Sequence, residues 1–413
     1  MQSWKRVLAV SFGKAIEYYD LAIYLALKDY IQANFIPESV FGSDSSFIYW
    51  VGFGLRYVLR PLGGFLIGSY ADRYGRKPTL IFISIATGIA TLTMAILPSY
   101  HQFGILATCF FFFCQMVQSF SFSGESATAF VYLLEGAKEN EQARTNALIW
   151  AFPVLSVALS IGLVFSIKLF LTEDQMYSFG WKIPLLLGLI NIILSYYFKS
   201  KLSETVCIHE TKKKESVQLI QVFKIFLLTA PATIIFHNIA VSNSIIIKKF
   251  TADPYMQSYL PAFFNIILFV TCFIVSSLID KFSHCQVILK RSYFIIMFLA
   301  MPVYALQSMG TWPAIIIAQV FLTLFFALVY SSTGTVMFNA APSNNKVATI
   351  ATGMNLAVAS LGAFTPLVVS ILSQYGQAYI GLFMSFGSLC FFAALALDKY
   401  TQSASAPVST VSS

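Results

Sequence analysis

The segment GSYADRYGRKP, residues 68–78, joins two long apolar runs near the start of the chain. Gly68 allows a helix end to approach a neighbour closely, and Gly75 permits a tight turn. Asp72 can pair with a helix N-terminus or with an arginine, and a charge-assisted hydrogen bond of this kind holds one conformation. We interpret the segment as a short basic loop between two helices, with an acid that fixes how they meet a neighbour.

Apolar runs recur along the whole chain of 413 residues, of which 57% are hydrophobic and only 11% charged. Soluble domains carry about 25% charged residues. A helix needs roughly 20 apolar residues to cross a hydrocarbon core of ~30 Å, and a lipid-facing backbone must satisfy its own hydrogen bonds. The runs lie at residues 7–33, 46–70, 79–98, 103–134, 145–171, 182–198, 218–247, 257–280, 286–307, 312–340, 347–372 and 378–399. The sequence predicts an all-α membrane protein with twelve transmembrane helices.

The positions of lysine and arginine predict the orientation. If the N-terminus is cytoplasmic, most of the 26 Lys and Arg lie in cytoplasmic loops, as the positive-inside rule requires. Lys199 is counted among these loop residues, at the start of the longest polar stretch. That stretch divides the chain into two sets of six spans. The expected parts are an N-terminal bundle at 1–198, a cytoplasmic linker at 199–217, a C-terminal bundle at 218–400 and a disordered tail at 401–413, with both termini cytoplasmic.

Composition and spacing exclude several other classes. The net charge of +8 is not gathered into a basic patch with interleaved aromatic residues, so nucleic acid is not an expected partner. The six cysteines are scattered without zinc spacing, and no phosphate loop or nucleophile–base arrangement is present. The first span continues into charged residues without a small-residue cleavage site, so we expect it to be retained. No enzymatic activity, metal or cofactor is expected.

The pattern G-x-x-x-D-R-x-G-R-K in residues 68–78, on a twelve-span chain, resembles the signature loop of the major facilitator superfamily. Other segments resemble its metabolite:proton symporter family, which includes carriers of proline and betaine, 2-oxoglutarate, citrate and shikimate. These segments are residues 13–20, 59–64, 118–125 and 179–184. The resemblance covers about residues 11–205 and is fainter afterwards, where the loop is reduced to Asp280-Lys281. It implies two pseudo-symmetric six-helix halves around a central cavity, which rock alternately and use the proton gradient.

The resemblance assigns the loop the role of a conformational gate. Asp72 and Arg76 are expected to hold the cytoplasmic side shut. Glu135, near the end of span four, is expected to brace the loop by pairing with Arg73 or Arg76. The complete set of gate candidates is Gly68, Asp72, Arg73, Gly75, Arg76, Lys77 and Glu135.

Three acids inside the spans are candidates for proton coupling, because burying an ionisable group there costs roughly 2.5–3.5 kcal/mol. Glu125 is the first candidate, since it lies far from both ends of span four among glycine and serine. Glu17 and Asp20 are three residues apart and share one side of a helix. The alternative for these two is a structural ion network with Lys14 and Arg60.

The candidates for substrate binding are polar and aromatic residues inside the spans: Arg56, Arg60, Gln115, Gln118, Tyr18, His237 and Asn238. The family usually has an arginine where this chain has Gln115, and a small residue where it has Arg56. Either Arg56 replaces the arginine that would grip a substrate carboxylate, or the substrate is not a simple anion. Arg56 and Arg60 are one helical turn apart and can form a forked anion site. The alternative is that each pairs with an acid in the membrane.

The sequence thus predicts a secondary active transporter, a proton-coupled symporter that takes up an organic acid or a zwitterionic osmolyte or amino acid. One alternative is an exporter of the same superfamily that handles a drug or a siderophore-like metabolite. Another is a transporter-like nutrient sensor. The expected partners are the small-molecule substrate, H+ and the lipid bilayer. We expect a monomer in the bacterial inner membrane.

Overall fold

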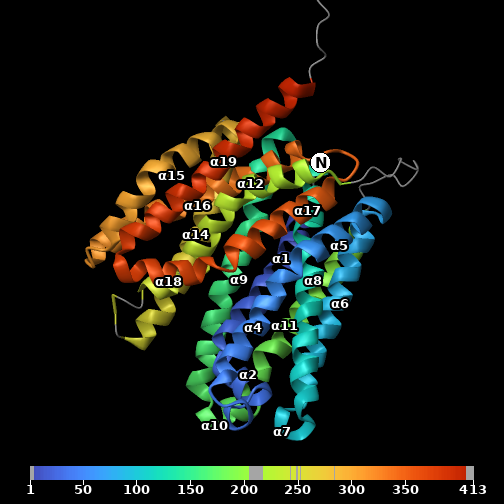
Figure 1. Ribbon diagram of the computed structural model, residues 1–413, viewed down its shortest axis with the longest axis vertical. Coiled ribbons are helices and arrows are strands. Elements are labelled where there is room, and N and C mark those ends of the chain that lie inside the picture. The colour runs from blue at the N-terminus through green and yellow to red at the C-terminus, as the bar shows by residue number, and fades with distance from the viewer. Residues whose placement is uncertain are drawn as a thin grey trace, which may run out of the picture.

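The computed structural model describes residues 4–203, 217–241, 243–247, 250–251, 253–282 and 284–405. Within these ranges the chain is helical and contains no strand (Figure 1). The first half holds α1 (Trp4–Ala26), α2 (Lys28–Phe35), α3 (Glu38–Phe41), α4 (Asp44–Val58), α5 (Arg60–Tyr74), α6 (Arg76–Ile96), α7 (Tyr100–Phe103), α8 (Ile105–Glu135), η1 (Glu139–Glu141), α9 (Gln142–Phe170), α10 (Glu173–Gln175), η2 (Met176–Gly180) and α11 (Lys182–Ser200). The second half holds α12 (Leu219–Phe236), η3 (His237–Val241), α13 (Asn243–Ile247), α14 (Pro254–Phe282), α15 (Cys285–Gln307), α16 (Trp312–Ala340), α17 (Lys346–Ala357), η4 (Val358–Gly362), α18 (Thr365–Tyr375) and α19 (Gln377–Ser405).

Every predicted apolar run overlaps one of these helices, which confirms the twelve-span fold. In the described part of the chain, 10 helices are long and apolar enough to cross a membrane by length and composition alone. The two remaining spans are α1, whose charged residues lower its hydropathy, and the pair α4 and α5. Pro61 has no N–H to donate and interrupts the helical hydrogen bonds there. Leu59, between the two helices, keeps a helical conformation (φ −76°, ψ −16°), so they continue as one span.

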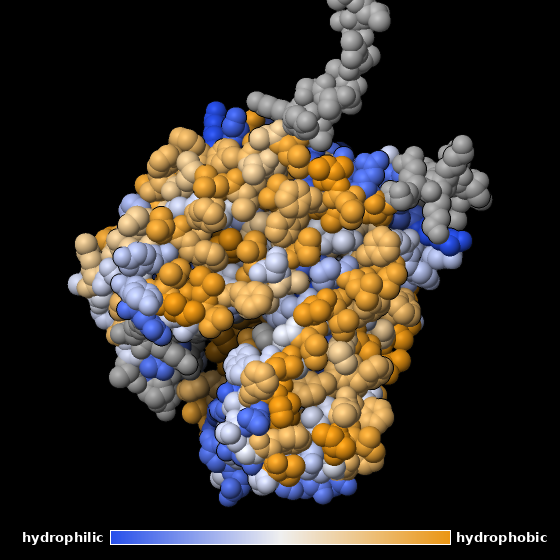
Figure 2. Space-filling view, viewed as in Figure 1, coloured by the Kyte–Doolittle hydropathy of each residue, from blue (hydrophilic) through white to orange (hydrophobic). Residues whose placement is uncertain are grey.

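The outer surface of the helical bundle is apolar. Figure 2 shows hydrophobic residues over the sides of the molecule and hydrophilic residues gathered toward its ends. Large side chains such as Phe170, Phe82 and Leu278 are exposed on these sides. Contiguous apolar surface of this extent marks an interaction site in a soluble protein, whereas in lipid it is the ordinary outer face. The surface therefore agrees with a multi-pass membrane protein.

The two six-helix halves meet mainly where α5 packs against α17 and α9 against α14, and also where α9 packs against α16 and α8 against α17. In the first pair a Cβ atom on Gly68 would lie 2.7 Å from the Cα of Ala348, and one on Gly64 would lie 2.8 Å from the carbonyl oxygen of Ala351. The halves are therefore packed backbone to backbone at the end that contains Asp72. They diverge toward the opposite end, where α10 and α18 lie, and Figure 2 shows the surface hollowed between them there.

Several boundaries differ from those predicted. The positive-inside pattern assigns Lys199 to a solvated loop, but α11 continues to Ser200 and the Lys199 side chain is buried. The physical reason is that Glu125 in α8 neutralises the charge of Lys199. The positive-inside rule does not consider such pairs between helices. Helix α19 continues to Ser405, into the predicted tail. The remainder of the predicted linker and tail, residues 204–216 and 406–413, lies outside the described residues.

Candidate functional site

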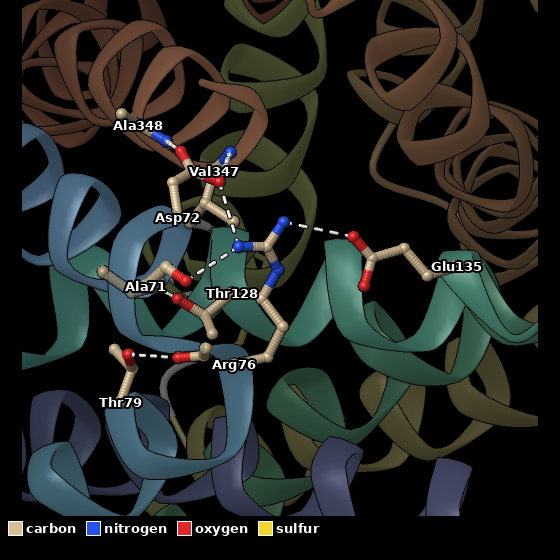
Figure 3. Close-up of polar contacts among 10 residues, drawn as sticks. Ala71, Asp72, Arg76, Thr79, Thr128, Glu135, Val347 and Ala348 are labelled. Atoms are coloured by element: carbon tan, nitrogen blue, oxygen red, sulfur yellow. Dashed lines mark hydrogen bonds and ion pairs between the residues drawn. The ribbon is translucent and has the colours of Figure 1, made fainter. Parts of the chain in front are cut away.

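The signature loop holds Asp72 against the second half of the chain. Its Oδ1 accepts a hydrogen bond from the backbone N–H of Val347 (3.1 Å), and its Oδ2 accepts one from Ala348 (2.9 Å) (Figure 3). Both N–H groups belong to the first turn of α17, where the positive end of the helix dipole favours an anion. One carboxylate therefore links the two halves directly.

Arg76 fixes the orientation of this carboxylate. Its Nη1 donates to Asp72 Oδ1 (3.0 Å) and to the carbonyl oxygen of Ala71 (2.8 Å). Its Nη2 donates to Glu135 Oε1 (3.1 Å), so Glu135 lies where the sequence places it, beside the loop (Figure 3). Gly75 adopts a φ of 108° between α5 and α6, which favours glycine and turns the chain back on itself. The loop thus presents one preoriented acid to α17.

Two other predicted gate residues lie at the edge of this arrangement. The Arg73 guanidinium lies 5.1 Å from the ring centroid of Tyr74, on the exposed side of α5. Lys77 is half-buried in the first turn of α6. Of the two arginines considered as partners of Glu135, the structure selects Arg76.

A second contact of the same kind is formed by Asp280 at the end of α14. Its two carboxylate oxygens accept hydrogen bonds from the backbone N–H groups of Ala143 (2.8 Å) and Arg144 (3.0 Å), at the start of α9. The Arg144 Nε also donates to Asp280 Oδ2 (3.0 Å). The sequence reduces this second loop to Asp280-Lys281, without the arginine of the first loop. Arg144 takes the place of that arginine, and it belongs to α9, the helix that Asp280 caps. The clue in the sequence is the equivalent position of Asp72 and Asp280, each at the end of the second span of its half.

We expect Asp280→Asn to open the Asp72 end of the molecule about as much as Asp72→Asn does. Loss of one helix-capping carboxylate costs about 1 kcal/mol, or roughly a fivefold shift in the population of the closed form. Labelling of a cysteine at the buried position Val347, in a background without the native cysteines, by a polar thiol reagent measures this opening. Asp44→Asn, at an exposed helix start, is the matched control. Unchanged labelling in Asp280→Asn would contradict the role of the second contact.

Glu125, the first candidate for proton coupling, forms an ion pair inside the first half. Lys199 Nζ lies 2.5 Å from Glu125 Oε1 and donates to Ser84 Oγ at 2.9 Å. The side chains of the pair are only 2% and 3% exposed. A small cavity beside them is lined by residues of α6, α8 and α11, with space for about one water molecule. The sequence reasoning missed Lys199 because it lies at the end of its span.

Asp20, the second candidate, lies in a separate polar cluster. Gln118 Nε2 donates to Asp20 Oδ2 (2.9 Å) and to Thr91 Oγ1 (2.7 Å). The Arg56 guanidinium attracts the carboxylate and lies 5.4 Å from the ring centroid of Tyr24. Asp20 Oδ1 has no hydrogen-bond partner among the residues that the structure describes. One oxygen of a buried acid is therefore held in place while the other is open to a proton.

The cavity next to Asp20 is lined by one acid predicted to couple protons and by two polar residues predicted to bind substrate. Gln115 and Gln118 line it together with Asp20 and Tyr24. Gln115 Nε2 lies 3.7 Å from the sulfur of Met94. The structure thus brings Asp20, Arg56, Gln115 and Gln118 into one site on the first half.

The expected network of Asp20 with Arg60 is corrected by the structure. The Arg60 Nε donates to Ser119 Oγ at 3.4 Å, and its guanidinium lies 5.4 Å from the ring centroid of Tyr57. Arg56 provides the positive charge near Asp20, because it stands one turn earlier on the same span. The Arg56 guanidinium lies beside the Tyr24 ring and that of Arg60 beside the Tyr57 ring, each 5.4 Å from the ring centroid. The Glu17 side chain lies outside the described residues.

Tyr18 belongs to an aromatic cluster between the two halves. Its ring centroid lies 4.8 Å from that of Phe236, and Trp150 contacts both Phe236 (5.8 Å) and Tyr330 (4.7 Å). Tyr18 and Trp150 come from α1 and α9, whereas Phe236 and Tyr330 come from α12 and α16. The ammonium group of Lys14 lies over the Trp150 ring, 3.1 Å from its centroid. Sequence reasoning missed Trp150, which lies in an apolar run without any polar marker.

His237 and Asn238 begin η3, a π-helical turn that continues α12. His237 Nδ1 lies 2.9 Å from the Thr233 carbonyl oxygen, and the ring faces Gly362 of η4, where a Cβ would lie 2.7 Å from His237 Cε1. Within the described ranges neither polar atom of the fully buried Asn238 amide has a hydrogen-bond partner. Buried amides are normally paired, so the Asn238 amide is an exception among the described residues. Turns of this type occur frequently at functional sites.

Fold and contacts together define a class of protein. It is a multi-pass membrane carrier in which two six-helix halves close on each other through helix-capping acids, with polar and aromatic residues buried between and beside them. The sequence matches the family model of the Major Facilitator Superfamily over residues 10–364. The chain belongs to this superfamily, as the loop at residues 68–78 indicates.

Individual relatives and solved structures share only a minor part of the sequence with this chain. A protein of Staphylococcus aureus (strain MSSA476) named putative proline/betaine transporter is 27% identical over 394 residues, which cover 89% of this chain and 81% of that protein. A citrate-proton symporter of Klebsiella pneumoniae is 26% identical over 413 residues, with 93% and 89% covered. The proton:xylose symporter XylE, solved with 6-bromo-6-deoxy-D-glucose, has a TM-score of 0.77 at 13% identity, with 96% of this chain and 95% of that chain covered. The last likeness concerns the fold.

Proposed function

We propose that the protein is a proton-coupled symporter that takes up a small organic metabolite by alternating access. The observation that carries this proposal is Asp20, a buried acid with one oxygen open, beside a cavity in a carrier whose halves are closed at one end. The charge of a buried carboxylate can be neutralised either by a bound proton or by a fixed positive charge nearby. When the two conformations differ in how well they stabilise the charged carboxylate, proton binding shifts the equilibrium between them. The names of the two bacterial relatives support this class of transport.

The geometry favours Asp20 over Glu125 as the coupling residue. Lys199 neutralises Glu125 at 2.5 Å, so a proton on Glu125 would leave a buried lysine without its counter-ion. Asp20 is held by Gln118, an uncharged group that accepts either protonation state. Arg56 provides the positive charge that can replace the proton in the deprotonated form.

We expect Asp20→Asn to abolish accumulation of substrate against its gradient while exchange across the membrane continues. Asparagine keeps the size of the side chain and its carbonyl can still accept the Gln118 hydrogen bond, but it cannot take up a proton. Uptake and counterflow in proteoliposomes with an imposed pH gradient measure the two activities. Asp29→Asn, an exposed acid of α2, is the control and should transport normally. Normal accumulation by Asp20→Asn would refute Asp20 as the coupling acid.

The proposal includes an orientation and a direction. We place the Asp72 end in the cytoplasm of a bacterial cell, with both termini on that side, and the protein as a monomer in the inner membrane. The basic loop at residues 68–78 supports this, because lysine and arginine favour the cytoplasmic side. An exporter of a drug or siderophore-like metabolite is the alternative, and a pH gradient of reversed sign in the same vesicles separates the two directions.

A further inference from the structure

We propose that the cavity beside Asp20 binds one water molecule held by Gln115, and that this water delivers the coupling proton to Asp20. The inference rests on the proposed transport function, and it adds a route for the proton and a positioning residue. It starts from two residues that line the same cavity, each with one buried oxygen that accepts no hydrogen bond from the residues that the structure describes.

The two oxygens are Asp20 Oδ1 and Gln115 Oε1. Asp20 is 5% exposed and Gln115 is 4% exposed, so bulk solvent does not reach them. Gln118 donates to the other carboxylate oxygen of Asp20, and the amide nitrogen of Gln115 lies 3.7 Å from the sulfur of Met94. A buried acceptor without a donor is costly, and here two acceptors need one.

A single water molecule matches this cavity in size and in hydrogen bonding. The cavity has room for about one water, and a buried water needs about two to four polar partners. One O–H group can donate to Asp20 Oδ1 and the other to Gln115 Oε1. Much of the remaining wall, formed by Ile31, Phe111 and Leu185, has no polar side-chain atom. A metal cation would need more oxygen ligands and would add a positive charge near Arg56.

The groups around Asp20 favour transfer at Oδ1. The groups that face the carboxylate are Arg56 of α4, Gln118 of α8, Thr91 of α6, Gly188 of α11, and Tyr19 and Tyr24 of α1. Gly188 presents no side chain, and a Cβ there would lie 3.3 Å from Asp20 Oδ1. The Tyr19 hydroxyl donates to the Pro184 carbonyl oxygen (2.8 Å) instead of to the acid. Arg56 stabilises the carboxylate after the proton has left.

The transfer step moves one proton and no heavy atom. An excess proton that reaches the water makes it a hydronium ion. One O–H bond of this ion breaks as an O–H bond forms on Asp20 Oδ1, and a neutral water remains that still donates to Gln115 Oε1. Release of the proton is the same step in reverse. The Gln115 amide does not ionise, so its part is to hold the water in place.

The cavity lies entirely inside the first half of the chain. Its lining residues come from α1, α2, α6, α8 and α11, so rocking of one half against the other does not open it. Gln115 lies roughly 15 Å along α8 from Ile105, at the end of the molecule where α7 precedes it and opposite the end that contains Asp72 (Figure 1). The proton therefore enters from that end within one half, and Gln115 belongs to the proton route and not to the substrate site.

The first test separates net uptake from exchange in proteoliposomes. Net uptake requires proton transfer in every cycle, whereas exchange by the loaded carrier does not. We expect Gln115→Met, which keeps the length of the side chain and removes its oxygen, to slow proton-driven uptake about tenfold and to leave exchange at the wild-type rate. Gln102→Met, at an exposed glutamine of α7, is the control and should be normal in both. A general loss of packing would lower both rates together.

The second test detects the water itself. Infrared difference spectra between low and high pH are recorded on the purified full-length protein in lipid, in ordinary water and in water enriched in oxygen-18. The O–H bands of water shift with the isotope, whereas protein bands do not. We expect the wild type and Gln102→Met to show an isotope-sensitive O–H band, and folded Gln115→Met to lack it.

An isotope-sensitive band that persists in folded Gln115→Met, or net uptake that is unchanged in this variant, would overturn the inference. Sodium-driven uptake without a pH gradient, lost in Gln115→Met, would do the same, because the cavity would then hold a metal ion. The proposed function is tested separately. Loss of the band in Gln115→Met together with wild-type uptake that ignores a proton gradient would refute symport and keep the water site. Proton-driven uptake with an unchanged band would refute the water site alone.

Discussion

Replacement of Glu125 or Lys199 alone is expected to destabilise the protein by about 3–5 kcal/mol, the usual cost of leaving one partner of a buried ion pair without its counter-charge. The two side chains are 2.5 Å apart at their charged atoms and are almost completely buried between α8 and α11. Ser84 is the other group that receives a hydrogen bond from Lys199. A serine hydroxyl cannot replace the lost carboxylate as a counter-charge.

The double variant Glu125→Gln with Lys199→Met should recover most of this stability. Glutamine and methionine have nearly the sizes of the original side chains, and replacing both members of a buried pair is often neutral or favourable. Thermal and denaturant unfolding of the single and double variants in detergent measure the effect. Single variants that lose less than about 1 kcal/mol, the value typical of an exposed pair, would contradict the buried ion pair.

The same double variant separates a structural role for Glu125 from a role in coupling. We expect it to accumulate substrate in response to a proton gradient, because Asp20 is still present. If the folded double variant exchanges substrate but cannot accumulate it, Glu125 carries the transported proton and the assignment to Asp20 is wrong. The measurement is thus informative whichever acid is used.

Gly68→Ala is expected to prevent closure of the Asp72 end. The added Cβ atom would lie 2.7 Å from the Cα of Ala348 and 2.9 Å from its backbone nitrogen, so α5 and α17 would have to move apart. Overpacking of this kind costs about 1–3 kcal/mol, which corresponds to a shift of roughly 5- to 150-fold away from the closed form. The Asp72 hydrogen bonds to Val347 and Ala348 depend on the same approach and would lengthen.

Gly54→Ala is the matched control for this prediction. It lies in the same span, and a Cβ there meets nothing within 4 Å, so the gain in helix propensity is similar without the clash. Thiol labelling at Val347→Cys should rise strongly in Gly68→Ala and stay at the wild-type level in Gly54→Ala. Uptake should fall in the first and not in the second. Equal labelling in both variants would show that the backbone contact does not control closure.

The loop at residues 68–78 illustrates how much of the site the sequence could predict. The order of acid, glycine and arginine in residues 68–78 is local, and the helix ends it predicts agree with the structure within a few residues. The pairing of Glu135 with Arg76 joins neighbouring spans and could also be proposed. The counterpart at Asp280 was less visible because its arginine, Arg144, comes from the other half of the chain.

The sequence by itself determined the class, the twelve helices and the charged loop at residues 68–78 of this protein. Apolar run length and the cost of buried charge act residue by residue, so they can be read without knowing which helices touch. Only the tertiary structure decided the partners, among them Glu125 with Lys199, Arg56 rather than Arg60 near Asp20, and Lys14 with Trp150. Those partners are set by the side-by-side packing of helices far apart in the chain, and no local pattern encodes which faces meet.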